Sequence, residues 1–141
     1  MKRTATAVWQ GTLKEGKGSL ATQSKVLNNT PYTFRSRFGD GVETNPEELI
    51  AAAHAGCFTM ALSKQLGDAG HPAERLATTA NLSLDQVGTG FAITAIHLDL
   101  AGKVPGIDAA KFQALANDAK ANCPVSKVLN AKITLTAKLE S

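Results

Sequence analysis

Cysteine is scarce in this sequence, because only Cys57 and Cys123 occur among 141 residues. A chain of this length buries about 68–70% of the surface that its unfolded form exposes, so it can hold a core without disulfides or a structural metal. Two cysteines are also too few for the disulfide framework of a small secreted protein. Neither cysteine is needed for folding, which leaves both available for chemistry.

Long apolar runs are absent as well. The longest uncharged, mostly apolar run, residues 49–62, has 14 residues, whereas a transmembrane helix needs about 20. The first residues, MKRTATAVW, contain no sustained apolar core of the kind that a signal peptide has. We therefore expect a cytoplasmic protein with no membrane partner. In that reducing compartment a cysteine pair is more often redox-active or metal-binding than a permanent disulfide.

The sequence has no strong charge of one sign, since 15 Lys and Arg residues against 12 Asp and Glu residues give a formal net charge of +3. Residues 1–39 hold seven basic residues and one acidic residue, and four acidic residues follow within residues 40–48. The basic residues are scattered without interleaved aromatics, which argues against nucleic acid as a partner. The contrast between these two neighbouring segments predicts ion pairs within the chain.

Common motifs for cofactors and metals are missing. Gly88-Thr89-Gly90 precedes a predicted strand rather than a helix, so it is neither a phosphate loop nor a dinucleotide fingerprint. His54 and Cys57 lie three positions apart, but two ligands do not make a metal site, and a Cys–His nucleophile would lack a third group and an oxyanion hole. We expect no metal and no bound cofactor. His54 is interpreted as a core or interface histidine with both ring nitrogens hydrogen-bonded.

The pattern of apolar residues and turns predicts a single α+β domain over residues 1–141, with the order βββαββααβ. No linker, repeat or compositional break divides the chain. Strands are expected at residues 4–10, 19–24, 31–38, 77–87, 91–100 and 132–139, and shorter helices at residues 109–121 and 125–129. Asp108 is the expected N-cap of the first of these shorter helices, and Pro124 the first residue of the second.

The remaining helix is the most distinctive element. Asn45 is its expected N-cap, Pro46 takes the first helical position, and glycines at positions 67 and 70 end it. Residues 49–62 are apolar all round, which is typical of a helix that is buried on every side. Its cover would come from a sheet or from a second copy of the chain, because its many small residues permit close approach of another helix.

Two interpretations of the cysteines follow from the residues alone. In one interpretation both thiols are ordinary core residues, because free cysteine is among the most buried residue types. In the other they are reactive, since Cys123 directly precedes Pro124 at a helix start, where the positive end of the helix dipole favours a thiolate. Cys57 lies on a helix that also carries Glu47 and His54.

Five blocks of sequence resemble the osmotically inducible protein C (OsmC) branch of the OsmC/Ohr family. They are Phe34-x-x-Arg37-Phe38, TNPEEL at 44–49, AHAGCF at 53–58, VPGID at 104–108 and NCPVS at 122–126. The blocks occur in order over essentially the whole chain. The resemblance implies an OsmC-like fold, with antiparallel sheets packed around a long buried central helix in an intertwined homodimer.

The same resemblance implies a thiol-dependent peroxidase that reduces organic hydroperoxides without metal or bound cofactor. It assigns Cys57 as the peroxidatic thiol, Cys123 as the resolving thiol, and Arg37 and Glu47 as an assisting pair, with a dithiol reductant of the dihydrolipoyl type. The residue types suit this chemistry. Arginine is always charged and favours a thiolate, a carboxylate holds its guanidinium, and a second thiol captures the sulfenic acid as a disulfide.

The spacing of these residues sets two questions. If Asn45 is the N-cap, Glu48 turns back toward the cap and Glu47 is free to pair with Arg37, whereas with Thr44 as the cap the two roles exchange. In a strand Arg35 would share a face with Arg37 and could duplicate it. Ten helical residues rise about 15 Å, so Glu47 cannot contact Cys57 along one straight helix. We expect Arg37 and Glu47 to reach Cys57 from a partner subunit or after a break in the helix.

Four apolar residues are candidates to bind the substrate: Phe34, Phe38, Phe58 and Met60. Such a set suits an alkyl hydroperoxide, although core packing is the simpler expectation for at least two of them. Two further functions stay open on the sequence. One is a non-catalytic protein that binds a hydrophobic ligand and senses oxidation through its thiols, and the other is a structural stress protein with inert cysteines.

Overall fold

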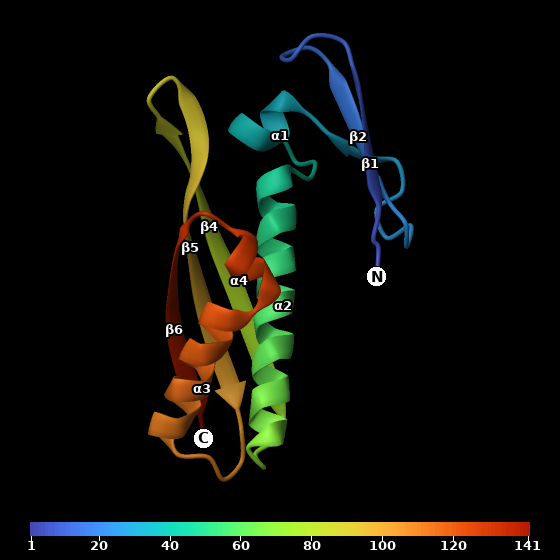
Figure 1. Ribbon diagram of the computed structural model, residues 1–141. Helices are drawn as coiled ribbons and strands as arrows, with labels where there is room; N and C mark the ends of the chain where they lie inside the picture. Colours follow the sequence, from blue (N-terminus) through green and yellow to red (C-terminus); the bar gives the residue numbers. More distant parts are fainter. The chain divides into compact units, whose positions relative to one another are not determined.

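The computed structural model describes residues 1–141, in the order β1, β2, β3, α1, α2, β4, β5, α3, α4, β6 (Figure 1). The chain forms two compact units, Met1–Leu49 and Ile50–Ser141. The boundary lies inside helix α2, which explains why no linker or compositional break marks it. The mixed α and β content agrees with the predicted class, and the one added element is a short helix before α2.

The first unit contains a three-stranded antiparallel sheet of β1 (Ala5–Gln10), β2 (Lys17–Thr22) and β3 (Thr30–Tyr32). Trp9 and Tyr32 pack together across it with ring centroids 5.5 Å apart. Gly18 lies between the two rings, where a Cβ atom would come within 2.4 Å of Tyr32 and 2.7 Å of Trp9. Glycine is required there so that the two aromatic side chains can cover the sheet.

The third predicted strand is wrong beyond Tyr32, because residues Phe34–Phe38 form the short helix α1. Thr33 caps this helix: its hydroxyl accepts the Ser36 N–H at 3.1 Å, and its own N–H donates to Ser36 Oγ at 2.9 Å. This reciprocal pair satisfies two backbone donors and outweighs the strand propensity of the aromatic residues. Residues two apart on a helix diverge by about 200°, so Arg35 and Arg37 do not share a face.

Helix α2 (Pro46–Asp68) begins where predicted and is continuous across the boundary between the units. Its buried side chains recur every four residues, at His54, Phe58, Leu62 and Leu66. The opposite face is open, and Met60 on it is 76% exposed. In this single chain α2 is therefore not buried on every side as the sequence pattern predicts. A helix with apolar residues on every face is expected to be buried, but its sequence does not show which molecule buries it.

The second unit contains a sheet with the strand order β4 (Arg75–Val87), β5 (Gly90–Lys103) and β6 (Lys132–Glu140). The β4–β5 hairpin is antiparallel as predicted. The expectation of purely antiparallel sheets is wrong, however, because β6 pairs with β5 in parallel. A connection through two helices returns the chain to the end of the sheet from which β5 started, and it therefore enters β6 in the same direction.

The connecting helices are α3 (Ala109–Asn122), capped by Asp108, and α4 (Pro124–Val128), capped by Cys123. Figure 1 shows α2 and α3 beside the sheet, and apolar residues of α2, α3 and β5 make one core there. Its fully buried members include Phe58, Ile96, Leu98 and Ala116. Burying such side chains contributes about 25 cal/mol per Å² of apolar surface, and this core fixes the positions of α2 and α4. No helix of the chain is both long and apolar enough to cross a membrane.

Candidate functional site

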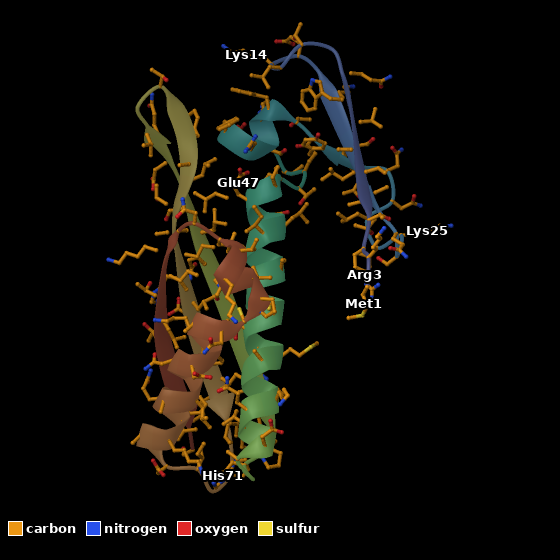
Figure 2. The ribbon with its side chains drawn as sticks, in the orientation of Figure 1. Met1, Arg3, Lys14, Lys25, Glu47 and His71 are labelled. Carbon is orange, nitrogen blue, oxygen red and sulfur yellow. The ribbon has the colours of Figure 1, made fainter.

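The first unit holds an ion pair between Arg37 of α1 and Glu47 in the first turn of α2. Figure 2 labels Glu47 at the start of α2. Arg37 Nε lies 3.0 Å from Glu47 Oε1 and 3.2 Å from Oε2, and Nη2 lies 2.8 Å from Oε1. Two donors of one guanidinium thus bind one carboxylate. The Glu47 side chain is 12% exposed and that of Arg37 42% exposed. The carboxylate is the buried anchor, and the guanidinium keeps a face open to solvent.

Hydrogen bonds between α1 and the start of α2 hold this pair in place. Ser36 Oγ donates to the carbonyl oxygen of Thr44 at 2.8 Å. Asn45 Nδ2 donates to the carbonyl oxygen of Ser36 at 2.9 Å. These two bonds join Ser36, which directly precedes Arg37, to Thr44 and Asn45 just before α2, so the backbone helps to fix where the two charged side chains meet.

The two questions left by the sequence have clear answers. Asn45 is the N-cap, because its Oδ1 accepts the Glu48 N–H at 2.8 Å. Glu48 Oε1 accepts the Thr44 hydroxyl at 2.6 Å, which leaves Glu47 for Arg37. Arg35 pairs instead with Asp40 at 2.6 Å, with both side chains well exposed. This ion pair raises the pKa of Arg35 and lowers that of Asp40, and it does not compete with the Arg37–Glu47 pair.

The second unit brings the two cysteines together although they lie 66 positions apart. Cys57 is on α2 and partly buried, Cys123 precedes α4 and is 1% exposed, and both are free thiols. The Cys123 side chain and the backbone of Val125 both influence the ionisation of the Cys57 thiol. The fold thus places the two thiols near each other, as a disulfide-forming pair requires.

The surroundings of Cys57 oppose its ionisation. Burial is the largest effect and raises the pKa of the Cys57 thiol; the backbone hydrogen bond with Val125 lowers it, and the Cys123 side chain raises it further. The net direction is upward because burial disfavours a charged sulfur. A reaction that uses a thiolate at this position needs a positive charge from elsewhere.

Ser126 and His54 lie beside Cys123, an arrangement that the sequence did not predict. His54 Nε2 is 2.7 Å from Ser126 Oγ, and Ser126 Oγ is 3.0 Å from Cys123 Sγ. His54 is fully buried, and its Nδ1 has no hydrogen-bond partner. The interpretation of His54 as a residue with both nitrogens satisfied is therefore wrong. The only sequence signal for Ser126 is its place in the NCPVS block, three residues after Cys123. In the structure its backbone N–H donates to Cys123 Sγ at 3.4 Å.

The four apolar candidates lie in different environments. Phe34 and Phe38 pack together on α1 with centroids 5.0 Å apart, and the Arg37 guanidinium carbon lies 5.2 Å from the Phe38 ring centroid. Phe58 is fully buried in the core, whereas Met60 is largely exposed. Phe58 thus has the core role that the sequence left open for part of this set.

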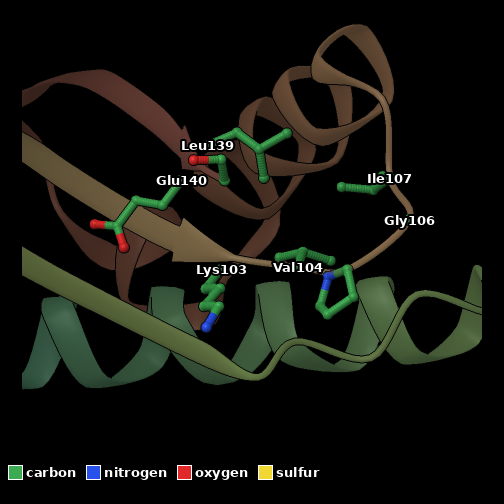
Figure 3. Close-up of a pocket in the computed structure, with 8 residues that line it drawn as sticks. Lys103, Val104, Gly106, Ile107, Leu139 and Glu140 are labelled. Atoms are coloured by element: carbon green, nitrogen blue, oxygen red, sulfur yellow. The ribbon is translucent and has the colours of Figure 1, made fainter.

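Two cavities lie in the second unit. One of about 440 Å³ is formed where β5 ends and the chain terminates, and Figure 3 shows Lys103, Val104, Leu139 and Glu140 around it. Another of about 550 Å³ lies along the open face of α2, beside Gly56 and Met60. Neither is lined by a thiol. No three His, Cys, Asp or Glu side chains gather closely enough to hold a metal ion.

Comparisons with known proteins agree with this arrangement. A family model described as OsmC-like protein matches residues 39–138. Peroxiredoxin OsmC of Escherichia coli (strain K12) is 55% identical over 135 residues, which cover 96% of this chain and 94% of that protein. An organic hydroperoxide resistance protein of Xanthomonas axonopodis pv. citri (strain 306) is 32% identical over 132 residues, covering 87% and 86%.

A solved structure shares the fold. The organic hydroperoxide resistance protein OhrB of Bacillus subtilis superposes with a TM-score of 0.68 at 26% identity, covering 97% of this chain and 98% of that one. The higher identity to the OsmC relative than to the Xanthomonas resistance protein matches the branch suggested by the sequence blocks. The chain belongs to the OsmC family.

Proposed function

We propose that this protein is a thiol-dependent peroxidase that reduces organic hydroperoxides to alcohols. The observation that supports it most directly is the proximity of the Cys57 and Cys123 thiols in a chain that has only these two cysteines. The names of its relatives point to the same reaction class. The two units act as one domain over residues 1–141, a proposal supported by a family match that begins in one unit and ends in the other.

The first step is an attack of the Cys57 thiolate on the terminal oxygen of the hydroperoxide. The O–O bond breaks, the alkoxide leaves as an alcohol after taking up a proton, and Cys57 becomes a sulfenic acid. Because burial raises the pKa of Cys57, a cation must stabilise the thiolate and the developing alkoxide. Arg37 supplies that charge, and Glu47 holds the guanidinium through the bonds described above.

The site is composite, with Arg37 and Glu47 contributed by a second copy of the chain. Of the two routes expected from the sequence, a helix break finds no support, since α2 is continuous from Pro46 to Asp68. The open face of α2, with Met60 76% exposed, supports a homodimer that covers it. Dimerisation is then required for activity, and a monomeric variant with full turnover would contradict this part of the proposal.

The second step forms a disulfide. The Cys123 sulfur attacks the sulfur of the Cys57 sulfenic acid, the S–O bond breaks, and water leaves. A dithiol of the dihydrolipoyl type then reduces the disulfide by two thiol–disulfide exchanges and becomes a cyclic disulfide itself. Phe34, Phe38 and Met60 are the proposed apolar contacts of the alkyl group, and Phe58, which is fully buried, belongs to the core that supports the site.

Consumption of tert-butyl hydroperoxide in the presence of dihydrolipoamide tests this function. We expect turnover by the unmodified protein, none by Cys57→Ser, and one equivalent of peroxide consumed by Cys123→Ser before it stalls. A ligand-binding or structural protein would show no turnover at all. Turnover by Cys57→Ser equal to that of the unmodified protein would refute the assignment of the peroxidatic thiol.

A further inference from the structure

The contacts around Cys123 form a continuous chain of hydrogen-bonding groups that leads away from the reacting sulfurs. It runs from Cys123 Sγ to Ser126 Oγ at 3.0 Å and from Ser126 Oγ to His54 Nε2 at 2.7 Å. All three side chains are buried. Ser126 belongs to α4 and His54 to α2, so the tertiary fold and not local sequence brings the chain of groups together.

A purely structural role explains His54 poorly. Its ring is fully buried, yet Nδ1 has no partner. An unsatisfied buried polar group destabilises a fold, and an apolar residue of similar size would avoid that cost. The buried His54 imidazole has one hydrogen-bonded nitrogen, and that nitrogen is linked through the Ser126 hydroxyl to the Cys123 thiol. Such an arrangement is typical of a group that serves the chemistry of that thiol.

The protonation state of His54 suits a proton acceptor. Burial lowers the pKa of His54, and no charged side chain contributes to this shift. The ring is therefore neutral near pH 7. Cys57 and Cys123 are the titratable groups that the surrounding elements bring to this cluster, since the core formed with β5 and α3 is apolar. With Nε2 unprotonated, the Cys123 S–H can donate to Ser126 Oγ and the Ser126 hydroxyl to His54.

We propose that Ser126 and His54 form a proton relay for Cys123 in the disulfide-forming step, a proposal that rests on the peroxidase function above. As the Cys123 sulfur bonds to the sulfur of Cys57, its proton passes to Ser126 Oγ and the Ser126 proton passes to His54 Nε2. The S–O bond breaks, and the leaving hydroxide takes a proton from solvent to become water. His54 returns its added proton to solvent, so the overall step produces one disulfide and one water.

Ser126 and His54 have different roles in this step. Ser126 contacts the reacting sulfur and is a catalytic residue. His54 acts through Ser126 and is a positioning residue that sets the direction of the serine hydroxyl. When a reducing thiol later attacks Cys57, Cys123 leaves as a thiolate, and a proton that His54 takes up from solvent reaches it through Ser126.

The test separates the two chemical steps in a single turnover. Reduced protein is mixed with one equivalent of tert-butyl hydroperoxide at several pH values between 6 and 8 and quenched at intervals with dimedone, which tags the sulfenic acid. Mass spectrometry then gives the rate of Cys57 oxidation and the rate of disulfide formation. The variants are His54→Gln, Ser126→Ala and Ser126→Thr. The control is Thr59→Val, which removes another hydroxyl bond of α2, to Thr78, away from the thiols.

We expect His54→Gln and Ser126→Ala to oxidise Cys57 at the rate of the unmodified protein and to form the disulfide about 10²-fold more slowly at pH 7, the usual size of a general-base effect. Their disulfide rate should rise about tenfold per pH unit, because hydroxide must now remove the thiol proton, whereas the unmodified protein varies much less. Ser126→Thr keeps a hydroxyl and should recover most of the rate. Thr59→Val should match the unmodified protein in both steps.

Equal disulfide rates and pH profiles in the unmodified protein and both relay variants, with Cys57 oxidation intact, would overturn the relay and leave the peroxidase proposal standing. Absence of Cys57 oxidation in the unmodified protein would instead overturn the peroxidase proposal. Circular dichroism establishes that each variant is folded. If His54→Gln does not fold, Ser126→Ala interrupts the same chain of groups without changing α2, and its pH profile decides the question.

Discussion

The Arg37–Glu47 pair predicts an unequal response to the loss of its two members. Arg37→Met leaves a carboxylate that is only 12% exposed without a partner, whereas Glu47→Gln leaves an arginine that is 42% exposed and can bind water. The glutamine carbonyl also still accepts a hydrogen bond. Removing one partner of a fully buried ion pair costs about 3–5 kcal/mol. Because this pair is partly open, we expect about 2–3 kcal/mol for Arg37→Met and about 1 kcal/mol for Glu47→Gln.

Urea unfolding followed by tryptophan fluorescence measures this difference, because Trp9 is the single tryptophan and lies in the same unit as the pair. Arg35→Met is the matched control. Arg35 is on the same short helix, but it and Asp40 are 70% and 83% exposed, so the free energy of unfolding should not change measurably. If Arg37→Met were no more destabilising than Glu47→Gln, the carboxylate would not be the buried anchor of the pair.

Three further predictions concern stability. Below pH about 6.5 the His54 side chain takes up a proton in the unfolded chain, whereas the buried ring of the folded protein resists protonation. The free energy of unfolding of the unmodified protein should therefore fall by up to about 1.4 kcal/mol per pH unit relative to that of His54→Gln. A difference in urea stability between the two proteins that is constant from pH 7 to 5 would contradict this. Asn45→Ala should lower the free energy of unfolding by about 1 kcal/mol, because the N-cap is lost. Asn45→Asp should recover only part of this stability in urea titrations, because a carboxylate accepts the Glu48 N–H but cannot donate to the Ser36 carbonyl oxygen. Full recovery would show that the bond to Ser36 is unimportant. Gly18→Ala should lower the free energy of unfolding by about 1–3 kcal/mol, since the added Cβ would meet Trp9 and Tyr32. An unchanged Trp9 fluorescence spectrum and an unchanged urea midpoint would refute the close packing.

Local signals in the sequence predicted much of this fold. The Asn45-Pro46 start of α2, the β4–β5 hairpin and the Pro124 start of α4 all follow from caps, turns and alternation, and they lie where expected. The charge contrast around residue 40 anticipated the Arg37–Glu47 ion pair. Each of these features depends on residues close together in the sequence, where side-chain type largely determines the backbone.

The errors occurred where distant residues or competing local bonds decide the structure. The capping box of Thr33 and Ser36 turned a predicted strand into α1. The parallel pairing of β6 follows from its helical connection and not from its own alternating pattern. The link from His54 through Ser126 to Cys123 spans 72 positions, so no spacing rule could have found it. The sequence thus proposes individual site residues, but it does not predict the network of contacts around them.

The account depends above all on Cys57 as the thiol that a hydroperoxide oxidises. The most direct measurement is the mass of Cys57 in the Cys123→Ser variant after one equivalent of tert-butyl hydroperoxide and dimedone. We predict a single dimedone adduct on Cys57, with one alcohol formed for each chain. Peroxide left unconsumed, with Cys57 still a free thiol, would contradict the account.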